Sequence, residues 1–325
     1  MGYASFSTRR TTGSMREYLF GRRGIYISDF RIECRMKIKT AVAQIGSAMF
    51  DTPATLRRVE QLCREASSAG IELLVFPEAL LGGYPKGMDF GAMVGARTEQ
   101  GRDLFLRYWN AAIDCPGPET AELAAWSREL GLHIVIGVVE RAGSTLYCTS
   151  LLFTPAEGLA TKHRKLVPTA SERVIWGRGD GTTMQVTETE IGRIGMAICW
   201  ENYMPLFRQH LYNQSVQLWC APTVDARPIW RTSMQHIAYE GRCFVLSACQ
   251  YLTLEDWGPN PPANVGRIEG GSIIASPFGA VLAGPAEKNS LLCAELDLDD
   301  IVRGKFDLDV AGHYNRPDVF SISTR

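Results

Sequence analysis

Three side chains that could do chemistry each follow a segment with the pattern of a strand. Glu78 and Cys199 come directly after continuous apolar runs, and Lys165 lies shortly after the strand-like segment 158–162. In α/β folds, ligand sites lie at the carboxyl ends of strands. We therefore predict that a carboxylate, a thiol and an ammonium group meet at one edge of the fold.

Nucleophilic catalysis by a thiol requires these three residue types. A thiol must become a thiolate to attack carbon, and an adjacent carboxylate can take its proton. Burial raises the pKa of such a carboxyl group, whereas a nearby ammonium limits the rise and stabilises negative charge that develops on the substrate. A buried Glu78–Lys165 ion pair beside an inert Cys199 would give the same spacing, so spacing alone leaves both interpretations open.

The elements that must position these residues alternate between strand and helix patterns. Strands are predicted over 40–45 and 71–76, and Asp51-Thr52-Pro53 begins an amphipathic helix between them that Gly70 ends. Further along the chain we predict helices over 119–130, 205–212 and 229–242, strands over 133–139, 194–198, 217–222 and 244–249, a meander near 142–158, and hairpin-like strands over 272–275, 281–283 and 291–296. The pattern predicts a single α/β domain whose sheets are covered by helices.

Composition and charge exclude several classes of function. The chain has 325 residues, of which 46% are hydrophobic and 21% charged, and its net charge is -1. This balance gives no electrostatic reason to bind nucleic acid or an anionic membrane, and no apolar run is long enough to span a bilayer. The nine cysteines are scattered and contain no CxxC pair, which indicates neither a disulfide framework nor a zinc ribbon. We expect a reduced, cytoplasmic protein.

Residues 1–35 differ from the rest, because they are rich in Arg, Ser and Thr and lack hydrophobic periodicity. Such a composition suits a targeting peptide, but the acidic residues Glu17, Asp29 and Glu33 and the lack of an amphipathic helix do not. We interpret this segment as a leader that precedes the folded domain, which we expect to span 36–325.

Two other patterns could indicate sites, and we interpret both as structural. His236 and Glu240 are spaced as metal ligands on a helix can be, but no third ligand accompanies them, so we predict no metal. The Gly-rich segment 177–181 lacks the order of a phosphate-binding loop. The GxSxG elbow of serine hydrolases does not occur.

Three motifs resemble the carbon–nitrogen hydrolase (nitrilase) superfamily, in the order and separation that the family shows. They are Phe-Pro-Glu-Ala at 76–79 with Gly-Gly-Tyr-Pro at 82–85, His-Arg-Lys-Leu-Val-Pro-Thr at 163–169, and Gly-Met-Ala-Ile-Cys-Trp-Glu-Asn-Tyr-Met-Pro at 195–205. The resemblance extends from about Lys37 to Leu298. Cys-Trp-Glu-Asn and the segment 171–177 are similar to the nitrilase branch.

The resemblance implies a four-layer α-β-β-α sandwich that forms homodimers or larger, at times spiral, homo-oligomers. It implies a catalytic triad of Glu78, Lys165 and Cys199, with Glu172 as a fourth polar residue that positions substrate or manages protons. It implies no metal and no organic cofactor.

Three further residues are candidates for binding the substrate because they are close in sequence to the triad. Trp200 and Tyr84 could line the pocket, although ordinary packing explains Tyr84 nearly as well. His163 could support Lys165, or it could be a polar strand residue.

The activity that the resemblance implies is hydrolysis of a small organic nitrile to a carboxylic acid and ammonia, through a thioimidate and then a thioester on Cys199. Glu78 would take the thiol proton, and Lys165 with the backbone N–H of Trp200 would stabilise the tetrahedral intermediates. An amidase or carbamoylase with the same triad, or a non-catalytic interaction module, are the alternatives. The sequence does not distinguish aliphatic, aromatic and arylacetic nitriles.

Overall fold

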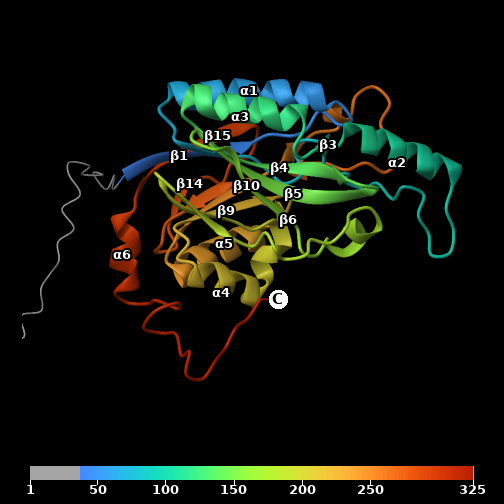
Figure 1. Ribbon diagram of the computed structural model, residues 1–325. Helices are drawn as coiled ribbons and strands as arrows, with labels where there is room; N and C mark the ends of the chain where they lie inside the picture. Colours follow the sequence, from blue (N-terminus) through green and yellow to red (C-terminus); the bar gives the residue numbers. More distant parts are fainter. Residues whose placement is uncertain (1–36, 325) are drawn as a thin grey trace, which may run out of the picture. The chain divides into compact units, whose positions relative to one another are not determined.

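The computed structural model describes residues 37–324, and the leader predicted over 1–35 lies outside the described residues. Within the described part, two β-sheets face each other across an apolar layer, and helices cover their outer faces (Figure 1). This is the α-β-β-α arrangement expected from the resemblance.

The first sheet has the strand order β15-β1-β2-β4-β5-β6, with β3 paired to β4. Its strands β1, β2 and β4 are parallel, whereas β15, β5 and β6 join it antiparallel. The strands are β1 (Lys37–Gln44), β2 (Leu73–Val75), β3 (Ile113–Asp114), β4 (His133–Ala142), β5 (Thr145–Thr154), β6 (Gly158–Arg164) and β15 (Ser290–Asp297).

The second sheet has the order β14-β13-β10-β9-β8-β7, and its central strands β8, β9 and β10 are parallel. A small pair, β11 with β12, lies outside both sheets. The strands are β7 (Val186–Thr189), β8 (Gly192–Met196), β9 (Leu218–Thr223), β10 (Phe244–Cys249), β11 (Tyr251–Leu252), β12 (Ile268–Glu269), β13 (Ile273–Ala275) and β14 (Val281–Ala283).

Helices α1 (Thr52–Ser68) and α3 (Pro118–Leu130) cover the first sheet, and α4 (Pro205–Asn213) and α5 (Pro228–Gly241) cover the second (Figure 1). Helix α1 begins where predicted, since the Asp51 side chain accepts the Ala54 N–H. The remaining helical segments are α2 (Glu99–Ala111), α6 (Asp299–Lys305) and the short 3-10 turns η1 (Ala170–Val174), η2 (Cys199–Tyr203) and η3 (Glu255–Trp257).

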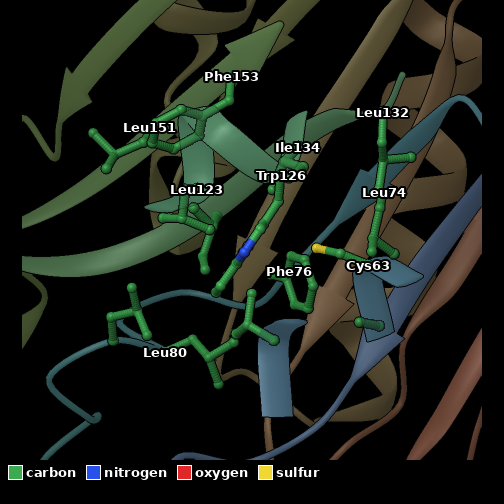
Figure 2. Close-up of a cluster of buried hydrophobic side chains, with 14 of the residues drawn as sticks. Cys63, Leu74, Phe76, Leu80, Leu123, Trp126, Leu132, Ile134, Leu151 and Phe153 are labelled. Atoms are coloured by element: carbon green, nitrogen blue, oxygen red, sulfur yellow. The ribbon is translucent and has the colours of Figure 1, made fainter. Parts of the chain in front are cut away.

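The core forms three apolar layers because the buried strands place alternate side chains on opposite faces. In β2, Leu74 points toward α1 and α3, whereas Leu73 and Val75 point toward the second sheet. Figure 2 shows the outer layer, in which Trp126 of α3 and Cys63 of α1 pack over the first sheet. Both faces of the sheet are thus buried, which explains why its central strands have continuous apolar sequences.

Candidate active site

Lys165 joins two carboxylates in the interior, just beyond the end of β6. Its Nζ donates to Glu78 Oε1 at 2.6 Å and to Glu172 Oε2 at 2.8 Å. The side chains of Lys165 and Glu78 are 0% exposed, and that of Glu172 is 8% exposed. The Tyr84 hydroxyl donates to Glu172 Oε1 at 2.8 Å. The structure therefore brings the predicted Glu78, Lys165 and Glu172 into one hydrogen-bonded group.

Glu78 is placed by a close approach of its backbone to β4. Gly137 N–H donates to Pro77 O at 3.0 Å, and Leu80 N–H donates to Gly137 O at 2.7 Å. A Cβ atom on Gly137 would lie 2.4 Å from Pro77 O and 2.5 Å from Glu78 Cα. Only glycine therefore allows this segment to lie so close to the strand.

Cys199 is the first residue of η2, at a sharp turn that follows β8. Its φ is +48°, in the left-handed region that a residue with a side chain rarely adopts. Asn202 Nδ2 donates to Cys199 O and to Ala197 O, each at 2.8 Å, and so holds the turn. Such strain persists where the surroundings over-determine it, and it is concentrated at functional sites.

Charge and burial shift the pKa values of Glu78 and Lys165 in opposite directions. Burial raises the pKa of Glu78, and Lys165 partly reverses the shift. Burial would lower the pKa of Lys165, but the negative charge of Glu78 raises it well above its usual value. Burial and the charge of Glu78 raise the pKa of Cys199 well above its usual range. The resting site therefore holds a neutral thiol beside a charged ammonium group.

A cavity of about 450 Å³ opens onto this group, and Cys199, Glu172, Tyr84 and Trp200 line it. Trp200 is 42% exposed, and its indole N–H donates to Asp225 Oδ2 at 2.9 Å. The positions of Tyr84 and Trp200 thus fit their predicted role in substrate binding.

His163, a candidate for binding the substrate, does not line this cavity. Its side chain is buried, and Nε2 lies 3.0 and 3.1 Å from the two carboxylate oxygens of Glu201. Those oxygens also accept the Leu166 N–H and the Ile198 N–H, each at 2.7 Å. His163 therefore supports Glu201, which sequence reasoning did not single out.

The pair His236 and Glu240 has a different environment from a metal site. Glu240 accepts hydrogen bonds from Arg208 Nε and from the Tyr212 hydroxyl, both at 2.8 Å, and His236 Nε2 lies 3.7 Å away. Within residues 37–324, no group of three or more His, Cys, Asp or Glu side chains is arranged to hold a metal ion. In the same residues, no helix is both long and apolar enough to cross a membrane.

Curated relatives match most of the chain. It is 51% identical to a bifunctional nitrilase/nitrile hydratase NIT4A of Lupinus angustifolius, over 88% of this chain and 85% of that protein. It is 50% identical to an arylacetonitrilase of Trametes versicolor, over 89% and 97% of the two chains. It is also 50% identical to an aliphatic nitrilase of Sinorhizobium fredii, over 88% and 95%.

Solved structures share the fold at low sequence identity. Nit3 of Saccharomyces cerevisiae, a member of the nitrilase superfamily, superposes with a TM-score of 0.68 at 19% identity, over 86% of this chain and 97% of that one. The NitFhit protein of C. elegans gives a TM-score of 0.68 at 20% identity, over 88% and 66%. The family model for carbon-nitrogen hydrolases matches residues 39–306. The chain therefore belongs to the carbon-nitrogen hydrolase family, in its nitrilase branch.

Proposed function

We propose that this protein is a nitrilase that converts an organic nitrile and two water molecules to a carboxylic acid and ammonia, with Cys199 as the nucleophile. The observation that carries the proposal is that Cys199 lines the cavity and lies within the electrostatic reach of the buried Glu78–Lys165 ion pair. The identity of about 50% with several curated nitrilases supports the nitrile as the substrate class.

Glu78 is the proposed general base. Its Oε1 is held by Lys165, whereas its Oε2 makes no hydrogen bond within the described residues and is left to receive the thiol proton. The raised pKa of Glu78 brings its proton affinity closer to that of the thiol, which makes the transfer easier. The thiolate then attacks the nitrile carbon, and the nitrogen is protonated to give a thioimidate.

Water completes the reaction in two additions. The first water adds to the thioimidate carbon, ammonia leaves, and a thioester remains on Cys199. The second water, deprotonated by Glu78, adds to the thioester, and the acid leaves as the sulfur regains its electron pair and proton. Each addition places negative charge beside the Lys165 ammonium group, which remains protonated. The backbone N–H of Trp200 is the second proposed donor to this negative charge. It lies in the first turn of η2, where backbone N–H groups have no hydrogen-bond partner within the helix.

We also infer that the chain self-associates through the surface near α6. Val302 and Phe306 are 71% and 87% exposed, and Tyr239 at the end of α5 and Phe278 are each almost half exposed. Arg242 stacks on Tyr239, with its guanidinium 4.0 Å from the ring centroid. Gly304 of α6 lies beside Arg242 and Phe278, so these exposed side chains belong to neighbouring elements. Exposed large apolar side chains on neighbouring elements favour a protein interface.

The proposed reaction is tested by measuring ammonia, acid and amide released from a panel of aliphatic, aromatic and arylacetic nitriles, with the corresponding amides assayed beside them. We expect acid and ammonia from nitriles, and loss of both in Cys199→Ala. Turnover of amides alone would identify an amidase. Absence of turnover, with Cys199 no more reactive than the other cysteines, would identify a non-catalytic module.

A further inference from the structure

Thr223 lies at the same level of the second sheet as Cys199. Strands β8 and β9 are parallel, and Met196 is the register partner of Cys220. Thr223 lies as far beyond Cys220 as Cys199 lies beyond Met196. The side chain of Thr223 is fully buried, and its contact with the Cys199 thiol shows that it faces the site from the end of the neighbouring strand.

The Thr223 hydroxyl takes part in two hydrogen bonds, one as acceptor and one as donor. Thr223 Oγ1 accepts the Asp225 N–H at 3.0 Å, and it lies 3.3 Å from Cys199 Sγ. A hydroxyl group carries one hydrogen. Since the amide occupies only an acceptor position of the oxygen, that hydrogen remains available for donation to the sulfur.

The backbone of Thr223 is held on two sides. It is paired with Cys249 in β10, and its carbonyl accepts the Gln250 N–H at 3.2 Å. The Gln250 side chain in turn donates to Glu78 O at 2.7 Å. A β-branched side chain on such a strand has little freedom at χ1. The hydroxyl is therefore positioned before substrate binds.

We propose that Thr223 is a further catalytic residue, whose hydroxyl donates a hydrogen bond to Cys199 Sγ and stabilises the thiolate. This inference rests on the proposed role of Cys199 as the nucleophile. Hydrogen bonds to an ionised acceptor are stronger than those to a neutral one, so the contact favours the thiolate over the thiol.

The environment of Cys199 as a whole disfavours a charged sulfur, so a donor in contact with the sulfur assists its ionisation. Burial and the charge of Glu78 raise the pKa of Cys199, and Lys165 and the Thr223 hydrogen bond act in the opposite direction. Lys165 already donates to two carboxylates. The Thr223 hydroxyl is thus the neutral group in direct contact with the sulfur that favours its ionised form.

Thr223 keeps its own proton throughout the reaction. The thiol proton passes to Glu78 when the carbon–sulfur bond forms, and the sulfur then carries no charge. When the acid is released, that bond breaks and its electron pair returns to the sulfur. The same hydroxyl then stabilises the leaving thiolate, so its loss slows both formation and breakdown of the thioester.

The experiment measures carbamidomethylation of Cys199 by iodoacetamide as a function of pH, followed by peptide mass spectrometry, with kcat measured on the best nitrile. Thr223→Val keeps the shape and removes the donor, and Thr223→Ser restores the donor. Thr40→Val, a buried threonine of β1, controls for the loss of a buried hydroxyl elsewhere. We expect Thr223→Val to slow alkylation at neutral pH about tenfold or more and to move its profile to higher pH. Thr223→Ser and Thr40→Val should stay close to the unsubstituted protein.

Alkylation of folded Thr223→Val with an unchanged rate and profile would overturn the inference. Equal losses in Thr223→Val and Thr223→Ser would also overturn it, because the hydroxyl would not be the cause. If Thr223→Val does not fold, comparison of Thr223→Ala with Thr223→Ser gives the same decision. The same experiment distinguishes a failure of the proposed function from a failure of this inference. If Cys199 were not an activated nucleophile, the unsubstituted protein itself would show no selective alkylation of Cys199.

Discussion

The two oxygens of the Glu78 carboxylate have different environments, because both side-chain donors contact the same oxygen. Lys165 Nζ and the Cys148 thiol both donate hydrogen bonds to Oε1, at distances of 2.6 and 3.5 Å. The backbone carbonyl of Cys148 also accepts the Lys165 N–H at 2.8 Å. Cys148 therefore contacts both members of the ion pair, and Oε2 of Glu78 has no hydrogen bond among the described residues.

At the residue scale, Cys148→Ala should move the acid limb of kcat/KM to higher pH. Glu78 must be ionised to take a proton, so activity falls as the pH falls through its pKa, which burial has already raised. Removing a donor to the carboxylate raises that pKa further. We expect a loss of about two- to tenfold on the acid limb, and near-normal behaviour of Cys148→Ser. Superimposable pH profiles of Cys148→Ala and the unsubstituted protein would contradict this role.

The sequence predicts the residues that carry the family motifs, but it does not predict their neighbours. Glu78, Lys165 and Glu172 form the expected group because each lies within or beside a motif. Thr223 lies in an ordinary apolar strand segment, and its contact with Cys199 follows only from the pairing of β8 with β9. Strand order is a property of the whole sheet, and no local pattern encodes it.

At the scale of elements, Glu201 joins the end of β6 to the turn that follows β8. Its carboxylate binds the N–H of Leu166, next to Lys165, and the N–H of Ile198, next to Cys199. Glu201→Gln would place an amide nitrogen against one of these donors. We expect a loss of about 2 kcal/mol or more in the free energy of unfolding, measured in urea, together with a fall in kcat.

The control for Glu201→Gln is Glu188→Gln on the exposed face of β7. That substitution should change the free energy of unfolding by no more than about 0.5 kcal/mol. Similar stability and kcat in both variants would show that the Glu201 carboxylate does not couple the two segments.

Gly137→Ala tests how β4 positions Glu78. The added Cβ would clash with backbone atoms of Pro77 and Glu78, which cannot rotate away. We expect destabilisation of about 3 kcal/mol and a large loss of kcat. Gly70→Ala is the control: it meets no atom within 4 Å but has a φ of +74°, so it should cost about 1–2 kcal/mol and leave kcat unchanged. A normal kcat in folded Gly137→Ala would show that the close approach to β4 is not needed to position Glu78.

Most elements were predictable from periodicity, and those that were missed have physical reasons. Residues 244–249 and 281–283 form strands with the predicted bounds. Helix α2 was missed, since Gly101 in its first turn and an exposed, charged first half weaken the helical pattern. Strand β7 was also missed, because its sequence is polar and partly exposed and it is held in the sheet by its pairing with β8. Tertiary contacts, rather than local sequence, decide such segments.

At the scale of the whole molecule, the outer surface near α6 should mediate self-association. Phe306→Glu would place a charge in an apolar interface, so sedimentation velocity should show a smaller species at the same concentration. Leu254→Glu, which changes an exposed leucine in the segment before η3, should sediment like the unsubstituted protein. An unchanged sedimentation coefficient for Phe306→Glu would exclude this surface as the interface.

The four layers assemble the site, because they bring Cys199 from one sheet close to Glu78 and Lys165 from the other. The most direct test is rapid acid quench during turnover of a nitrile, followed by mass spectrometry of the Cys199 peptide. We predict an added mass equal to the acyl group on Cys199, which disappears when the nitrile is exhausted. Steady turnover with no adduct on Cys199, together with turnover by Cys199→Ala at the same rate, would show that Cys199 is not the nucleophile.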